Sequence, residues 1–278
     1  MTSDIYSTSS LLIHRTPWWK LPRLRRWFEK VAFHLGGIGV MTGRLFKEAR
    51  GRWEWGEILR QMDSLGVQSI AITNLTALFT GMVLALQTAY ALAQFGGKLF
   101  VGRVVVLSVT RELGPVLTAL MVAARCGAGI TAELGTMAVT EQVDALRALG
   151  ASPLKKLVLP RVVAVTTMLP LLTMLTDFLG MIGGLFIAVF EIKIGASFYL
   201  STVMQSTRYN DILHGLCKTP FFGFEIALIG CYNGLSATGG ADGVGRSTTV
   251  AVVMASIAVL ATDFFLTKIF LSLPWGLN

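Results

Sequence analysis

The segment Leu65–Phe95 reads LGVQSIAITNLTALFTGMVLALQTAYALAQF and contains no charged residue. A helix needs about 20 apolar residues to cross the hydrocarbon core of a bilayer, so this segment predicts a transmembrane helix. The whole chain of 278 residues has a similar character, because 53% of its residues are hydrophobic, 14% are charged and the mean hydropathy is +0.64. Ordinary soluble domains carry about 25% charged residues. We therefore expect an integral membrane protein.

Four later segments are also long and apolar, with only a few charged residues in each. They lie at about Val104–Ala124, Val162–Phe190, Leu213–Leu235 and Ser247–Leu273. Together with Leu65–Phe95 they predict an all-α fold with five transmembrane helices, which puts the two termini on opposite sides of the membrane. The glycines of the third segment favour close helix packing over a dimer interface. They are Gly180, Gly183 and Gly184.

The residues ahead of the first span differ from the rest of the chain. In Trp27–Arg50, apolar residues recur mostly every three or four positions and charged residues occupy the remaining surface, which is typical of an amphipathic helix in the membrane interface. Residues 1–26 form a basic tail without the apolar core of a secretory signal. We divide the chain into this tail, an interfacial region of residues 27–60 and a five-span domain of residues 61–278.

Basic residues are concentrated on one predicted side of the membrane. Of the 24 lysines and arginines, 11 lie between Arg15 and Arg60, and further basic residues lie in the stretch Arg125–Arg161 between the second and third spans. Such residues are retained in the cytoplasm, so we expect the N-terminus and this stretch to be cytoplasmic. The net charge of +8 comes without a base-reading motif, and we expect no nucleic-acid partner. The three cysteines have no metal-site spacing, and we expect no metal.

Arg111 and Glu112 lie within the second predicted span. A charged residue at the centre of a bilayer costs roughly 2.5–3.5 kcal/mol on insertion scales, so it usually has a partner, a cavity or a function. The guanidinium could hold a lipid phosphate; the alternative is an ion pair that fixes the packing of spans one, two and five. Asp177 and Asp263 are single acids in the third and fifth spans, and structural pairing explains them more simply than proton transfer. Their candidate partners are Arg111, Arg125 and Lys218.

The segment Thr140–Leu149, between the second and third spans, predicts a short amphipathic helix. Thr140 can cap its N-terminus, Glu141 lies in the first turn where the helix dipole favours an acid, and Gly150 can end it. One face is apolar, and the other offers polar side chains to a partner or to solvent. The apolar residues are Val139, Val143, Leu146 and Leu149, and the polar ones are Glu141, Asp144 and Arg147. A docking surface and a surface helix packed on the spans are both compatible with this spacing.

A series of short motifs extends from the first span to the fifth. They are Gly81–Gln87 (GMVLALQ), Arg111–Leu120 (RELGPVLTAL), Ala124–Gly135 (ARCGAGITAELG), Thr140–Leu146 (TEQVDAL), Leu159–Arg161 (LPR), Gly234–Gly245 (GLSATGGADGVG) and Ala261–Asp263 (ATD). In this series the chain resembles the MlaE/YrbE family, the permeases of ABC transporters that work with MCE-domain proteins in lipid trafficking.

The resemblance implies a homodimer of five-span subunits in the bacterial inner membrane. It implies a central cavity for phospholipid that opens toward a periplasmic MCE-domain protein, and transport of lipid between the inner and outer membranes. Two cytoplasmic ABC ATPase subunits would bind the helix of residues 140–149, and a small STAS-type cytoplasmic subunit is a further candidate partner. The chain has no GxxxxGK[ST] motif, so we expect no catalytic activity and no cofactor here, with ATP and Mg bound by the partner ATPase.

The resemblance also implies roles for individual residues. The lipid cavity would include Leu84, Gln87, Leu92, Phe95, Arg111 and Glu112. The coupling to the ATPase would involve Thr140, Glu141, Asp144, Leu146 and Arg147. A socket or structural role falls to Arg125, Glu133, Asp177 and Asp263.

Two other functions are compatible with the residues alone. An ion-coupled secondary transporter could use Glu112, Asp177, Glu225 and Asp263 as a proton path, since intramembrane acids serve proton relays in pumps. The second alternative is a membrane scaffold, which would anchor a lipid-transfer complex without transporting anything. Copurification with a soluble ATPase would separate the permease from the secondary transporter, and ATP-dependent lipid movement would separate it from the scaffold.

Overall fold

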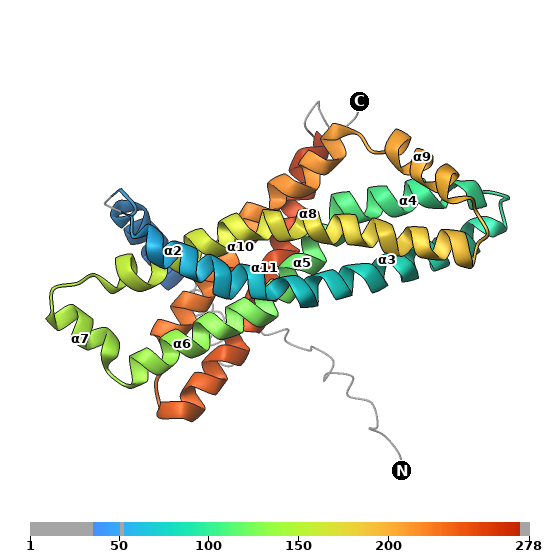
Figure 1. Cartoon of the computed structure of the whole chain (residues 1–278). Coiled ribbons are helices and arrows are strands. Elements are labelled where there is room, and N and C mark those ends of the chain that lie inside the picture. The colour runs from blue at the N-terminus through green and yellow to red at the C-terminus, as the bar shows by residue number, and fades with distance from the viewer. Residues whose placement is uncertain (1–35, 51–52, 273–278) are drawn as a thin grey trace, which may run out of the picture. The chain divides into compact units, whose positions relative to one another are not determined.

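The computed structural model describes residues 36–50 and 53–272 (Figure 1). Over these ranges the chain forms helices and turns with no β-strand, in agreement with the predicted all-α fold. The chain divides into two units, Met1–Gly43 and Arg44–Asn278. In the first unit the described residues, 36–43, are helical. The remaining description concerns the second unit.

Five helical segments in the described part of the second unit are long and apolar enough to cross a membrane, which confirms the predicted number of spans. Spans one to five are Trp55–Ala93, Lys98–Val139, Leu154–Phe190, Tyr209–Leu235 and Gly240–Phe270. Span two was predicted to end near Ala124, but it remains helical to Val139 because its last part packs against spans four and five. The predicted loop Arg125–Arg161 is therefore wrong at both ends, because residues 125–139 belong to span two and residues 154–161 to span three.

Spans one and two consist of α-helical segments joined by short 3-10 and π-helical turns. Span one consists of α2 (Trp55–Gln61), the π-helical turn η2 (Met62–Gly66), η3 (Val67–Ser69) and α3 (Ile70–Ala93). Span two consists of η4 (Lys98–Phe100), α4 (Val101–Ser108), the π-helical turn η5 (Val109–Leu113), α5 (Gly114–Val122), the π-helical turn η6 (Ala123–Gly127) and α6 (Ala128–Val139). The later elements are α7 (Gln142–Ala148), η7 (Leu154–Val158), α8 (Leu159–Phe190), α9 (Ala196–Ser206), α10 (Tyr209–Leu235) and α11 (Gly240–Ser272). Single π-turns are often found at functional sites.

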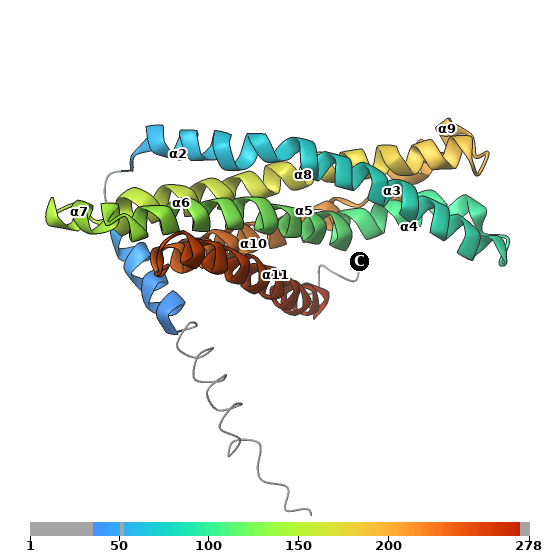
Figure 2. The ribbon, with the colours of Figure 1, turned by 90° about the horizontal axis from the view of Figure 1, so that it is seen from below.

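Helix α8 is the central element of the second unit. It packs along α3 on one side and α10 on the other, and α10 in turn packs against α11 and α6 (Figures 1 and 2). Span three can lie this close to span one because of its glycines: a Cβ at Gly183 would collide with the backbone carbonyl of Leu78, and Gly81 and Gly180 face each other backbone to backbone. The predicted packing role of this glycine series is confirmed.

The N-terminal predictions can be followed only in part. The tail of residues 1–26 and residues 27–35 of the predicted interfacial helix lie outside the described residues. Residues 44–48 are helical, Leu45 is buried with 3% exposure, and the Ser152 hydroxyl donates to the Glu48 carboxylate at 2.7 Å. Helix α2 begins at Trp55, inside the predicted region 27–60, and continues into span one. The limits of the basic tail, the interfacial region and the five-span domain stay predictions.

Candidate functional site

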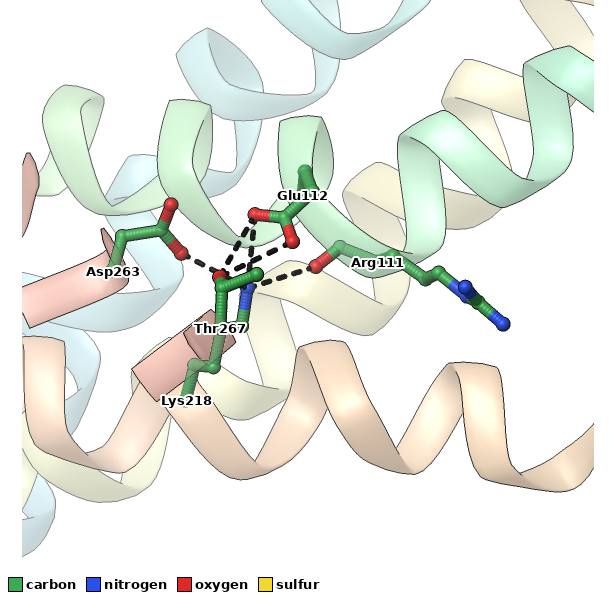
Figure 3. A network of polar contacts seen from close by, with 5 residues as sticks. All are labelled: Arg111, Glu112, Lys218, Asp263 and Thr267. Carbon is green, nitrogen blue, oxygen red and sulfur yellow. Dashed lines mark hydrogen bonds and ion pairs between the residues drawn. The ribbon is translucent and has the colours of Figure 1, made fainter. Parts of the chain in front are cut away.

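The π-turn η5 positions the charged pair of span two. Arg111 and Glu112 are adjacent in sequence, yet their side chains point apart (Figure 3). Each of them contacts a residue of span four. A π-turn contains one residue more than an α-helical turn, which shifts the direction of successive side chains. Arg111 and Glu112 therefore belong to two separate ion pairs.

Lys218 is the centre of the first of these contacts and is fully buried on α10. Its Nζ lies 2.9 Å from Glu112 Oε2 and 3.0 Å from Asp263 Oδ1 on α11. It also donates to the Thr267 hydroxyl at 2.6 Å and to the carbonyl oxygen of Arg111 at 3.2 Å (Figure 3). An ammonium has three protons, so these four acceptors satisfy it completely. The contacts connect spans two, four and five at one point, which we call the Lys218 cluster.

Arg111 makes the second contact, with Asp211 at the beginning of α10. Its Nε donates to Asp211 Oδ1 at 2.8 Å, and its terminal nitrogen Nη2 donates to the same oxygen. Asp211 also accepts the backbone N–H of Arg208 and so caps its own helix. The Asp211 side chain is buried, whereas 39% of the Arg111 side chain remains exposed. One edge of the guanidinium is thus accessible from outside the pair.

The charges of this region do not balance formally. Arg111 and Lys218 supply two cations, while Glu112, Asp211 and Asp263 supply three carboxylates. The polar hydroxyl of Thr267 donates to Glu112 at 3.2 Å and so satisfies part of the additional negative charge. Removing one partner from a buried ion pair leaves an uncompensated charge and typically costs about 3–5 kcal/mol, so each member depends on the others.

Sequence reasoning found some of these partners and missed others. The pairing of Asp263 with Lys218 is confirmed. The packing of spans one, two and five through the charged pair is wrong, since span four takes the place of span one. Asp211 was missed, although a spacing signal was present: polar residues recur on α10 at intervals of seven, which places them on one helix face. They are Asp211, Lys218 and Glu225.

Two acids in the spans, Asp177 and Glu225, form no ion pair with a described residue. Asp177 is buried on α8 and lies against Gly114, and its Oδ1 has no hydrogen-bond partner among the described residues. The predicted pairing of Asp177 with a basic residue is therefore wrong. Glu225 accepts a hydrogen bond from the Thr262 hydroxyl at 2.8 Å, while its other oxygen is buried without a partner in the described part of the chain.

An open groove of about 340 Å³ runs along α3 beside the end of η5. Its walls are mostly apolar, with two polar residues among them, and they include two of the six residues assigned to the lipid cavity, Leu84 and Gln87. The lining residues are Phe79, Thr80, Val83, Leu84, Gln87 and Leu113. Leu113 directly follows Glu112 in sequence, so the groove adjoins the charged pair without being lined by it.

The other expected cavity residues lie elsewhere. Leu92 packs against the buried cluster that joins α3 to α4, and Phe95 lies beyond the end of α3 with 84% exposure. The structure therefore does not gather all six residues around one groove. Their role in lipid binding stays a prediction.

The socket residues connect the same end of spans one, two and three. Arg125 on η6 donates to the Ser69 hydroxyl at 2.6 Å and to Gln68 at 3.2 Å. Glu133 on α6 pairs with the buried Arg161 of α8 at 2.7 Å. These bonds hold the helices next to α7, and a direct role in coupling stays a prediction.

The segment Thr140–Leu149 forms a helix, but it begins later than predicted. Thr140 is not its N-cap, because Thr140 still belongs to the end of α6, where its hydroxyl donates to the Thr136 carbonyl. Glu141 adopts a left-handed backbone with φ of 61° and separates α6 from α7, so it does not lie in the first turn. Gly150, with φ of 75°, ends the segment as expected.

The exposed side of α7 carries a charge pair and an apolar residue. Asp144 and Arg147 form an exposed ion pair at 2.7 Å, Leu149 is 82% exposed, and Val143 is buried. Leu146 is half-buried. The division into an apolar inner face and a polar outer face is confirmed except at Leu149. Because Leu149 is exposed, the surface of this segment offers an apolar contact as well as charges.

Comparison with known proteins agrees with this architecture. The family model for the permease MlaE matches residues 58–269. A probable ABC transporter permease protein of Synechocystis is 44% identical over 245 residues, which cover 88% of this chain and 92% of the relative. The intermembrane phospholipid transport system permease protein MlaE of Haemophilus influenzae is 38% identical over 237 residues, covering 84% and 91%. The chloroplastic protein TRIGALACTOSYLDIACYLGLYCEROL 1 of Arabidopsis thaliana is 37% identical over 234 residues, covering 84% and 67%.

The five apolar spans and the permease family model define a multi-pass membrane protein of the permease class. The chain belongs to the MlaE permease family, as the resemblance of its motifs indicated. Its relatives are described as ABC transporter permeases, which disfavours the ion-coupled secondary transporter.

Proposed function

We propose that this chain is the membrane-spanning subunit of an ABC transporter that moves phospholipid between the inner and outer membranes. The observation that carries the proposal is the family match over residues 58–269, which includes the groove, the Lys218 cluster and α7. The Haemophilus relative, whose printed name describes intermembrane phospholipid transport, supports the cargo. The chain itself is non-catalytic in this proposal, and a partner ATPase binds ATP and Mg.

The groove along α3 is the proposed entry of the lipid. Its apolar walls suit acyl chains, and Gln87 and Thr80 offer polar contacts near them. The exposed edge of Arg111 lies on the same span as Leu113 and suits a phosphate oxygen, since guanidinium groups hold phosphates through paired hydrogen bonds. In this proposal, Arg111 contacts the lipid headgroup, and the Lys218 cluster holds spans two, four and five together near the groove.

Helix α7 is the proposed contact for the ATPase. Its exposed Asp144 and Arg147 supply charges, and Leu149 supplies an apolar anchor at the end of the helix. Arg125 and Glu133 hold spans one to three together behind it, so that movement of α7 is passed on to the spans. Thr140, Glu141 and Leu146 form the connection between α7 and the spans.

The assembly proposed around this chain contains a second copy of it, a periplasmic MCE-domain protein and a small STAS-type cytoplasmic subunit. The excess of basic residues before span one and around α7 supports an orientation with the N-terminus in the cytoplasm. In that orientation α7 faces the ATPase, while the turn between spans one and two and helix α9 face the periplasm.

Copurification tests the proposal with a matched pair of charge reversals. Asp144→Arg alters α7, and Glu191→Arg places the same change on an exposed residue at the opposite end of span three. We expect the unchanged chain and Glu191→Arg to copurify with the cognate soluble ATPase, and Asp144→Arg to lose most of it while remaining in the membrane. Equal recovery of the ATPase with both variants would contradict the role of α7.

A further inference from the structure

A second apolar pocket lies apart from the groove, between the chain segment that precedes span one and the helices α8 and α10. Its volume is about 290 Å³, and it shares no residue with the groove along α3. Its lining residues are Leu45, Phe46, Ala49, Trp53, Leu159, Val162, Val163, Thr166, Thr167 and Phe224. The residues from α8 begin at its N-terminus, so the pocket lies in the half of the membrane that is nearer to α7.

The pocket is held open by fixed contacts. Leu45 is buried, and Glu48 is tied to Ser152 by a hydrogen bond of 2.7 Å. The rings of Phe46 and Phe224 lie 6.1 Å apart at a tilt of 30°, and the indole N–H of Trp53 donates to the Ala49 carbonyl at 2.7 Å. Phe46 nevertheless remains 63% exposed. The aromatic walls are thus positioned around a space that protein atoms of the second unit leave empty.

One residue in the wall of the pocket carries a polar group without a partner. The hydroxyl of Thr166 is buried without a hydrogen bond in the described part of the chain, whereas the neighbouring Thr167 hydroxyl donates to the Val163 carbonyl at 2.8 Å. A buried hydroxyl without a partner costs free energy, so such groups usually bind a water or a ligand.

Basic residues lie next to the pocket on the same segment. Arg44, Lys47 and Arg50 are exposed and form no ion pair with a described residue. At a rise of about 1.5 Å per residue, Arg44 and Lys47 lie within one helical turn of Phe46. An anionic headgroup would complement this charge. Residues 1–35 would not, because that part of the sequence carries six basic and two acidic residues.

We propose that this pocket binds one acyl chain of an anionic glycerophospholipid, whose phosphate contacts Lys47 and Arg50. The lipid belongs to the cytoplasmic leaflet, a placement that rests on the proposed orientation. It is a resident lipid that fixes residues 44–50 and Trp53 to spans three and four, and it is separate from cargo in the groove along α3.

Photolabelling of the full-length protein in nanodiscs tests this site. The probe is phosphatidylglycerol with a diazirine in its acyl chain, in a background of phosphatidylcholine, and labelled peptides are mapped by mass spectrometry. Val163→Trp fills the pocket, and Leu171→Trp adds the same side chain to an exposed position of α8 outside it. We expect labelling of the peptides around Trp53 and Thr166 to fall several-fold with Val163→Trp and to remain with Leu171→Trp.

A surface variant keeps the test valid if Val163→Trp fails to fold. In the double variant Lys47→Gln and Arg50→Gln, we expect the preference for phosphatidylglycerol over a phosphatidylcholine probe to disappear at the same peptides. Equal labelling in all variants, labelling spread evenly over the exposed face of α11, or cross-links from the pocket to residues 1–35 or to a second copy would overturn the proposal. None of these outcomes depends on whether the protein transports lipid.

Discussion

The buried ammonium of Lys218 and the carboxylate of Glu112 lie 2.9 Å apart and connect spans four and two in the interior of the protein. Lys218 has no exposed surface and also contacts Asp263 on span five. Charged side chains in a membrane interior are expensive unless they are paired. The position of the three spans therefore depends on this one cation.

Replacing Lys218 by methionine is expected to destabilise the protein. The substitution keeps the length of the side chain but leaves Glu112 and Asp263 facing each other, which should cost about 3–5 kcal/mol. Thermal unfolding in detergent measures the loss. Lys268→Met is the matched control in span five, because Lys268 has no ion pair with a described residue, and its midpoint should hardly change.

A rescue experiment separates the loss of the ion pair from the loss of packing. If unpaired carboxylates cause the damage, adding Glu112→Gln and Asp263→Asn to Lys218→Met should recover part of the unfolding midpoint, since contacting residues are not additive. A triple variant that is less stable than Lys218→Met would contradict this interpretation.

Replacing Arg111 by alanine is expected to reduce the cross-linking of phospholipid without changing the oligomeric state of the protein. The guanidinium offers an exposed edge, whereas the main connection between the spans passes through Lys218. Cross-linking with a photoactivatable headgroup analogue measures the contact, and the elution volume in detergent monitors assembly. Unchanged cross-linking would assign Arg111 a structural role with Asp211.

Gly183→Ala and Gly129→Ala should have opposite effects on stability. A Cβ at Gly183 collides with the backbone of Leu78, so spans one and three must separate, at a cost of about 1–3 kcal/mol. A Cβ at Gly129 meets nothing within 4 Å, and alanine should stabilise α6 by up to about 1 kcal/mol. Both changes can be measured as shifts of the thermal unfolding midpoint, and equal shifts would exclude the proposed helix contact.

Tyr199 should resist ionisation at high pH. It is buried on α9, its hydroxyl donates to the Met181 carbonyl at 3.4 Å, and burial raises its pKa from 10.0 to about 12. The neutral phenol is therefore favoured in the folded protein, so its stabilising effect is fully present below pH 10 and is lost as the pH rises through about 12. The difference in phenolate absorbance between the wild type and Tyr199→Phe should be near zero at pH 10; a clear difference would show that Tyr199 is solvated.

The number of spans could be predicted because hydropathy is a local property that a bilayer selects directly. The ends of the spans could not be predicted in this way. Residues 125–139 are rich in glycine and contain charges, and they remain helical only because α10 and α11 pack beside them. The same limit explains the error at Thr140, since a good capping residue was absorbed into the preceding helix.

The charged pair Arg111 and Glu112 was also predictable only in part. Its unusual position was evident from the sequence, but its partners depended on the π-turn η5, which has no sequence signal that we can identify. Once η5 turns Glu112 toward span four, the pairing with Lys218 follows from charge alone. The unpaired Asp177 was not predictable, because its surroundings are set by the contact between α8 and Gly114.

The most direct test reconstitutes the chain with its ATPase in vesicles and follows the transfer of fluorescent phospholipid to acceptor particles. We expect transfer that requires ATP hydrolysis, that is lost with Asp144→Arg in the exposed face of α7, and that is retained with Glu191→Arg. Transfer driven by a proton gradient without ATP, at the same rate in Asp144→Arg, would contradict the assignment of this chain as an ABC permease.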